Sequence, residues 1–191
     1  MPVQKVTRDD WLYAALTTLA RSGVTAVSVE PIARGLGVTR GSFYWHFKDR
    51  EALLIGALEL WESEATTSFI EALTPITDPA ERLSTLLREA LTGDEIAGLE
   101  PALVAHASDP VVSVVLERVT RRRMAYLEEC FRDLGLDKRE ARLQAVAAYA
   151  AYLGWVELRR AAPDAVPEVA RTGRKSRAAI DHLLSMLAGS R

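Results

Sequence analysis

The sequence predicts an all-α protein with about nine helices. One pattern recurs along the 191 residues: a capping residue, then apolar residues at helical spacing, then a glycine or proline. The alternation of apolar and polar residues that is typical of a half-buried strand is found nowhere. The composition is 49% hydrophobic and 26% charged, which is typical of a folded chain with a sizeable core. We therefore expect packed helices joined by short turns.

The first predicted helix extends from Thr7 to Ser22. Thr7 is followed three residues later by Asp10, as in an N-terminal capping box, and Gly23 ends the helix. One side of this helix is apolar, and it would pack behind the helices that follow. That side consists of Trp11, Leu12, Ala15, Leu19 and Ala20.

Two short helices and a tight turn follow. The first extends from Val29 to Leu36 with Ser28 as its N-cap, and Gly37 supplies the left-handed residue that ends it. The second begins at Thr39 or Arg40 and ends near Phe47. A turn of three to four residues between two helices is the spacing of a helix-turn-helix.

The outward face of the second short helix indicates a ligand. Phe43 and Phe47 are one turn apart and point inward, so a tyrosine and a tryptophan are left exposed beside an arginine. Such a surface is unfavourable in water unless a partner covers it, and arginine binds phosphates and guanine edges. DNA is the partner that fits. The residues on this face are Arg40, Gly41, Ser42, Tyr44, Trp45 and His46.

The stretch SVEPIARGLGVTRGSFYWHFKDREALL, residues 28–54, resembles the DNA-binding motif of TetR/AcrR-type transcriptional regulators. The resemblance extends from near Thr7 to Leu54. It implies an all-helical, dimeric repressor that binds operator DNA and is released from it by a small molecule. It also implies a helix-turn-helix DNA-binding domain at residues 1–50 and a larger ligand-binding and dimerisation domain at residues 51–191.

The resemblance also implies roles for single residues. Arg40, Gly41 and Ser42 would begin the recognition helix, with Thr39 ahead of them, and Lys48 would anchor the DNA backbone. Ser28 would cap the preceding helix and touch phosphate, whereas Val29 and Glu30 are assigned no base contact. The residues that would contact the groove and the phosphates are Tyr44, Trp45 and His46. For His46, capping of helix carbonyls is an equal alternative, and Asp49 and Arg50 fit ordinary solvated charges as well as DNA contacts.

Further helices are predicted beyond this motif. The capping residues, apolar spacing and glycine or proline stops place them at residues 49–73, 78–91, 101–107, 109–134, 137–161 and 174–187, with a loop at 162–172. The helix from Asp137 is rich in alanine, which allows helices to approach closely. With the apolar residues of the last helix it would form a four-helix interface in a two-fold dimer; the alternative is a bundle within one chain. These residues are Ala141, Ala145, Ala147, Ala148, Ala150, Ala151, Gly154, Ile180, Leu183, Leu184 and Leu187.

An effector pocket is expected among aromatic and polar-tipped residues of the middle helices, although the same residues could simply form the core. The candidates are Phe69, Leu103, His106, Tyr126, Tyr149, Tyr152 and Trp155. The run Arg121-Arg122-Arg123 is interpreted as a solvated helix face; pointing inward, it would favour an anionic effector. Cys130 is interpreted as a buried packing residue.

The sequence argues against several other classes. Its three histidines are not spaced as a metal pair, its single cysteine cannot form a thiolate zinc cluster, and nucleotide-binding or hydrolase motifs are missing, so we expect no enzyme, cofactor or metal. The N-terminal residues do not fit a signal peptide and no long apolar run occurs, so a cytoplasmic location is expected. Residues 1–54 carry seven Lys/Arg against five Asp/Glu, whereas the whole chain has a net charge of −2. That balance disfavours a nonspecific nucleic-acid coat.

Two alternatives stay open at this point. One is a DNA-binding regulator with no small-molecule effector. The other is a helical protein that uses the motif to contact protein. Sequence-specific binding of duplex DNA would exclude the second, and loss of that binding with an effector would exclude the first.

Overall fold

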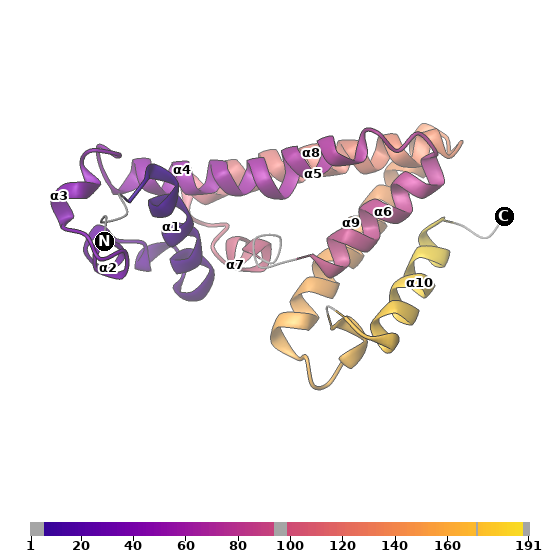
Figure 1. The fold of residues 1–191 in the computed structure, drawn as a ribbon. Helices are drawn as coiled ribbons and strands as arrows, with labels where there is room; N and C mark the ends of the chain where they lie inside the picture. The colour runs from indigo at the N-terminus through magenta and orange to yellow at the C-terminus, as the bar shows by residue number, and fades with distance from the viewer. Residues whose placement is uncertain (1–5, 94–98, 171, 189–191) are drawn as a thin grey trace. The chain divides into compact units, whose positions relative to one another are not determined.

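The structure, a computed structural model, describes residues 6–93, 99–170 and 172–188 (Figure 1). Within these ranges it is helical without a strand, as the sequence predicts. The α-helices are α1 (Arg8–Ser22), α2 (Val29–Gly35), α3 (Arg40–Phe43), α4 (Arg50–Glu62), α5 (Phe69–Leu73), α6 (Pro79–Thr92), α7 (Glu100–Ala105), α8 (Pro110–Asp133), α9 (Lys138–Ala161) and α10 (Arg174–Ala188). Short 3₁₀ turns occupy Val24–Ala26 and Pro167–Val169.

Side chains cap α1, α6 and α9 where the sequence predicts. Thr7 and Asp10 form the reciprocal capping box of α1, and Gly23 ends that helix with a positive φ of 80°. The Asp78 carboxylate accepts hydrogen bonds from two first-turn N–H groups of α6, and Asp137 does the same for α9. Each carboxylate satisfies backbone donors that have no partner within the helix.

Two predicted helices differ from the structure. The recognition helix was expected to reach Phe47, but α3 ends at Phe43 and the next residues form tighter turns, with the Trp45 N–H donating to the Ser42 carbonyl. The helix predicted over residues 49–73 contains a π-helical segment, Ser63–Ser68, between α4 and α5. This SEATTS segment is rich in hydroxyl and β-branched residues, which favour the regular α-helix weakly. Counting α4 to α5 as one continuous helix, the described residues contain the nine helices predicted.

The chain packs as two compact units. The first comprises residues 1–65 and 102–118, and the second comprises residues 66–101 and 119–191, each as far as it is described. The functional boundary at residue 50 stays a prediction, because compactness alone does not test it. None of the helices in the described ranges has the length and apolar character needed to cross a membrane.

Each unit has its own apolar core. In the first unit, Trp11, Leu54 and Trp61 are fully buried, and the Phe43 ring packs edge-on against Trp11 with 5.4 Å between centroids. In the second unit, α6, α8, α9 and α10 contribute a core that includes Leu87, Phe131, Ala145 and Ile180. The core of the first unit fixes the helices that carry the candidate site.

Candidate functional site

The helix-turn-helix forms with the predicted glycine turn, although α3 is shorter than expected. α2 is followed by Gly37 in the left-handed region with a φ of 70°, and the Val38 N–H donates to the Ala33 carbonyl across the turn at 3.0 Å. Phe43 and Phe47 point inward with exposed fractions of 0% and 4%, and their rings stack on each other. The two aromatic side chains therefore lock α3 against the core.

The opposite face of α3 and the turns after it lies open. Trp45 has 89% of its surface exposed and Tyr44 has 54%. The nine residues predicted to contact DNA are all exposed or half-buried: Ser28, Thr39, Arg40, Gly41, Ser42, Tyr44, Trp45, His46 and Lys48. All nine thus lie at the accessible surface of the first unit, while their contact with DNA stays a prediction.

The first turns of α2 and α3 both lack a side-chain cap. Ser28 occupies the N-cap position of α2 and Thr39 that of α3, and both have extended backbones. Neither hydroxyl accepts a hydrogen bond from its own helix, so the prediction that the Ser28 side chain caps α2 is wrong. The backbone donors of both first turns are left for solvent or a ligand.

Two charged residues after α3 have structural contacts. Asp49 caps α4, with its carboxylate accepting the Ala52 N–H at 2.8 Å. The Arg50 guanidinium donates to the carbonyl oxygens of Val24 and Val27. Both residues are exposed, as expected for solvated charges, but each also has a structural contact. Lys48 lies beside Asp49, with 3.8 Å between Nζ and the carboxylate, and 82% of its side chain is exposed.

Arg40 has two neighbours on the exposed face. Its guanidinium lies 3.5 Å from the Glu30 carboxylate and donates to the Tyr44 hydroxyl at 3.3 Å. The hydrogen bond to Tyr44 raises the pKa of Arg40, and the negative charge of Glu30 adds to this effect. Glu30 is the second residue of α2, so this contact joins the two helices of the motif.

The structure does not bring the seven candidate effector residues together within one unit. Leu103 and His106 belong to the first unit, where the His106 ring packs against Gly23 and its Nδ1 lies 2.8 Å from the Ala102 carbonyl. The other five belong to the second unit. Phe69, Tyr126 and Trp155 pack there as partly buried side chains against the apolar core.

Tyr149 and Tyr152 belong to a buried polar cluster of the second unit. Arg123 and Glu100 form an ion pair with exposed side-chain fractions of 12% and 1%, and the Tyr149 hydroxyl donates to Glu100. Arg123 Nε donates to the Thr66 hydroxyl at 2.9 Å, and the guanidinium lies 5.9 Å from the centre of the Tyr152 ring. Burial, with the charge of Glu100, raises the pKa of Tyr149 to about 12 and also raises that of Tyr152.

Glu100 is not among the residues that the sequence predicts for this cluster, and one arginine of the run at 121–123 differs from its expected place. Arg123 is largely buried, so the interpretation of Arg121-Arg122-Arg123 as a solvated face is wrong for this residue. Its position is one turn from Val119 and one turn from Leu127, both of them buried, and this spacing could have indicated its inward direction.

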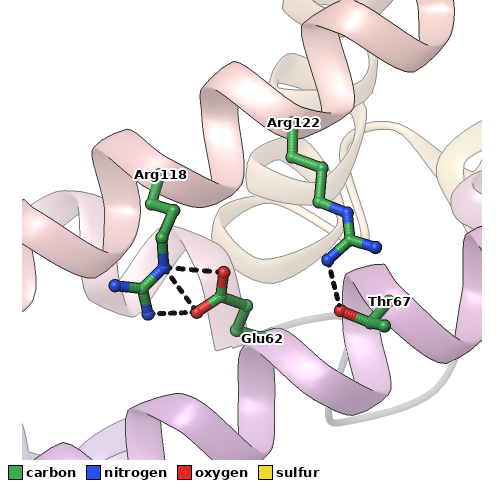
Figure 2. A network of polar contacts seen from close by, with 4 residues as sticks. All are labelled: Glu62, Thr67, Arg118 and Arg122. Atoms are coloured by element: carbon green, nitrogen blue, oxygen red, sulfur yellow. Dashed lines mark hydrogen bonds and ion pairs between the residues drawn. The ribbon is translucent and has the colours of Figure 1, made fainter.

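Two arginines of α8, one turn apart, bind half-buried partners (Figure 2). In the second unit, Arg122 donates to the Thr67 hydroxyl at 2.7 Å. In the first unit, Arg118 forms a forked ion pair with Glu62, with Nε donating at 2.8 and 2.9 Å to the two carboxylate oxygens. The Glu62 hydrogen bond raises the pKa of Arg118.

The remaining chemistry is sparse. Among residues 6–93, 99–170 and 172–188, the structure contains no group of three His, Cys, Asp or Glu residues that could hold a metal ion. Cys130 is 1% exposed, which confirms its packing role, and burial raises the pKa of its thiol to about 11.

Comparison with known proteins agrees with the geometry of the first unit. Residues 12–57 match the sequence profile of the bacterial regulatory proteins of the tetR family. The HTH-type transcriptional regulator AcrR of Shigella flexneri is 41% identical over 86 residues, which are 44% of this chain and 38% of AcrR. The chain matches less than half the length of this and other curated relatives.

Solved structures resemble almost the whole chain. A transcriptional regulator from Rhodococcus sp. Rha1 superposes with a TM-score of 0.74 at 19% identity, covering 96% of this chain and 95% of that one. AibR, solved in complex with isovaleryl coenzyme A and operator DNA, has a TM-score of 0.67 at 19% identity, with 94% and 96% covered. At such identities the likeness concerns the fold. The helix-turn-helix within residues 12–57 is thus similar to that of the bacterial regulatory proteins of the tetR family, and the chain has the fold of solved transcriptional regulators.

Proposed function

We propose that the chain is a transcriptional repressor that acts in the cytoplasm. A homodimer binds a palindromic operator, and a small-molecule effector releases it. The observation that carries the proposal is the exposed Tyr44 and Trp45 surface flanked by Arg40 and Lys48, on a helix-turn-helix of the TetR family. Aromatic side chains, an arginine and a lysine on one such face match the needs of groove and phosphate contacts.

The surface of α9 supports a homodimer. This helix exposes Leu143, Val146 and Leu158, with 60%, 48% and 44% of their surfaces accessible. Ala147, Ala150 and Gly154 are exposed between them at helical spacing. Burial of this apolar face against a second copy would stabilise a dimer. A dimer places two recognition helices about 34 to 36 Å apart, the spacing of half-sites one DNA turn apart.

Release by an effector is supported by the buried polar cluster of the second unit. A ligand with an anionic group would compete with Glu100 for Arg123, while Tyr149 and Tyr152 would offer aromatic surface. AibR, which has the same fold, was solved with both an acyl coenzyme A and operator DNA. By linkage, an effector that prefers the conformation unable to bind DNA weakens operator binding by the same factor by which DNA weakens effector binding.

A second candidate function is a DNA-binding regulator with no effector. It is favoured by the internal pairing of Arg123, because the guanidinium already has Glu100 and Thr66 as partners. A protein of this kind would bind its operator constitutively.

The experiment that tests the proposal is a selection of genomic fragments by the purified full chain at physiological salt, followed by sequencing. A palindrome with spaced half-sites is the expected result. Trp45→Ala serves as the matched control, since its exposed side chain contributes little to folding. Fragments retained equally by both proteins, or no enrichment, would contradict the proposal. Loss of operator binding with metabolites of the adjacent genes would then separate the two candidates.

A further inference from the structure

The N-terminal ends of the two motif helices are joined by a pair of opposite charges. Glu30 is the second residue of α2 and Arg40 is the first residue of α3, and Arg40 Nη1 lies 3.5 Å from Glu30 Oε1. The other terminal nitrogen of Arg40 donates to the Tyr44 hydroxyl at 3.3 Å, one turn further along. A carboxylate and a phenol therefore hold the guanidinium on the exposed face.

The stability of the fold does not account for this pair. The side chains of Arg40 and Glu30 are 61% and 67% exposed, and exposed ion pairs contribute little to folding. A carboxylate on a face that meets DNA also opposes binding, because phosphates repel it. Glu30 therefore lowers the affinity for any duplex, unless its contact with Arg40 offsets this repulsion.

We propose that Glu30 is a specificity-determining residue that positions Arg40, an inference that rests on the proposed function. A guanidinium has five N–H groups, so one donated to Glu30 and one to Tyr44 leave three for a guanine edge or a phosphate. Held by Glu30 and Tyr44, the guanidinium loses less freedom when it meets a correctly placed base. On other sequences the phosphates must compete with Glu30 for Arg40 and are repelled by its charge. Glu30 thus lowers the affinity for a non-operator duplex more than the affinity for the operator.

The test measures the ratio of affinities for two duplexes. One is the sequence enriched by the wild-type chain in the genomic selection, and the other is a scrambled duplex of equal length and composition. Glu30→Gln keeps the size of the side chain and removes its charge. The matched control is Glu51→Gln, which makes the same change of charge at an exposed residue in the first turn of α4. Thermal unfolding confirms that both variants keep the fold.

We expect Glu30→Gln to strengthen binding to the scrambled duplex more than to the operator and to lower the affinity ratio at least about fivefold. Glu51→Gln should change both affinities alike and leave the ratio as it is. In an Arg40→Ala background, Glu30→Gln should leave the ratio unchanged, because a positioning residue has no effect without the residue that it positions.

Two results would contradict the inference but not the proposed function. One is an affinity ratio that Glu30→Gln leaves unchanged. The other is a decrease of the ratio that is equally large in the Arg40→Ala background. The second result would make Glu30 a base contact in its own right. A wild-type chain that binds both duplexes equally would instead contradict the proposed function, and the inference with it. The wild-type ratio therefore distinguishes the two failures.

Discussion

The Arg50 side chain donates hydrogen bonds to the carbonyl oxygens of Val27 and Val24, both at 2.6 Å. Arg50 is the first residue of α4, whereas the two valines lie in the connection between α1 and α2. One side chain thus ties α4 to the connection from which the helix-turn-helix begins. Both carbonyls lie on buried residues, so loss of their partner is costly.

Arg50→Ala should therefore lower the free energy of unfolding by about 1 to 3 kcal/mol, since hydrogen bonds to charged groups contribute that much. Urea unfolding followed by circular dichroism measures the change. Lys48→Ala, which removes a neighbouring and mostly exposed positive charge, is the control and should cost less than about 0.5 kcal/mol. Equal stabilities of the two variants would argue against the structural role of Arg50.

The same lysine and Arg40 should differ in their effects on DNA binding. Arg40→Ala should cost about 1 to 3 kcal/mol and relax base preference at one position of each half-site. Lys48→Ala should weaken binding to all sequences alike. It should also reduce the slope of log affinity against log salt concentration by about one. Titrations of the selected operator and its single-base variants at several salt concentrations measure both. Equal losses on every sequence would show that Arg40 does not contact a base edge.

Gly23 should tolerate no side chain. Its φ is 80°, and an added Cβ would lie 2.4 Å from His106 Nε2. Gly37 also has a positive φ, of 70°, but an added Cβ would meet nothing within 4 Å. Gly37→Ala should therefore cost about 1 to 2 kcal/mol from backbone strain alone, and Gly23→Ala should cost more.

A double-mutant cycle with His106→Ala isolates the contact behind that difference. Gly23→Ala should be less destabilising in the His106→Ala background than in the wild type, because the clash is removed. Thermal or urea unfolding gives the four free energies. Additive effects would show that the strained backbone of Gly23, and not the histidine, opposes the side chain.

The buried ion pair of the second unit should be sensitive to the loss of one partner. Glu100→Ala leaves the mostly buried Arg123 without its carboxylate and should cost about 3 to 5 kcal/mol of folding stability. Replacing both residues by apolar ones, Glu100→Leu with Arg123→Met, should cost less than the single change. The exposed pair of Arg88 and Asp181 is the control: Asp181→Ala should cost less than about 1 kcal/mol. A similar cost for Glu100→Ala and Asp181→Ala would contradict the prediction.

Cys130 should make stability depend on alkaline pH. Burial raises the pKa of its thiol to about 11, whereas an unfolded cysteine titrates near pH 8.5. At neutral pH both states are protonated and the thiol has no effect. Between these two values the unfolded chain loses a proton that the folded chain keeps, so the free energy of unfolding falls as the pH rises. Cys130→Ala should lack this decline, and parallel pH profiles of the two proteins would contradict the prediction.

The sequence alone predicted most helices and the exposed face of the motif. Its success depended on local signals: Thr7, Asp78 and Asp137 cap their helices as expected, and Phe43 and Phe47 point inward. Where these signals end, the prediction is less accurate. The π-helical turn around Thr66 cannot be detected from the spacing of apolar residues, because one extra residue in a turn shifts that spacing without abolishing it.

The tertiary contacts could not be predicted in the same way. Glu100 and Arg123 are 23 positions apart, and glutamate and arginine are residue types that usually lie on the surface. The contact of Arg40 with Glu30 spans a glycine turn, so it depends on the angle between two helices and not on the pattern of either. The division of the candidate effector residues between two compact units has the same origin, since periodicity identifies buried faces but not which faces meet.

The 89% exposure of Trp45 also has an optical consequence. Trp11 and Trp61 are fully buried in the same unit, so their emission should lie at shorter wavelengths than that of Trp45, whose indole is in water. A soluble quencher such as acrylamide should therefore reach Trp45 first. Binding of a macromolecule over this face would shield one fluorophore, and unfolding would expose the others. The chain thus contains intrinsic fluorophores that distinguish occupation of its surface from loss of its core.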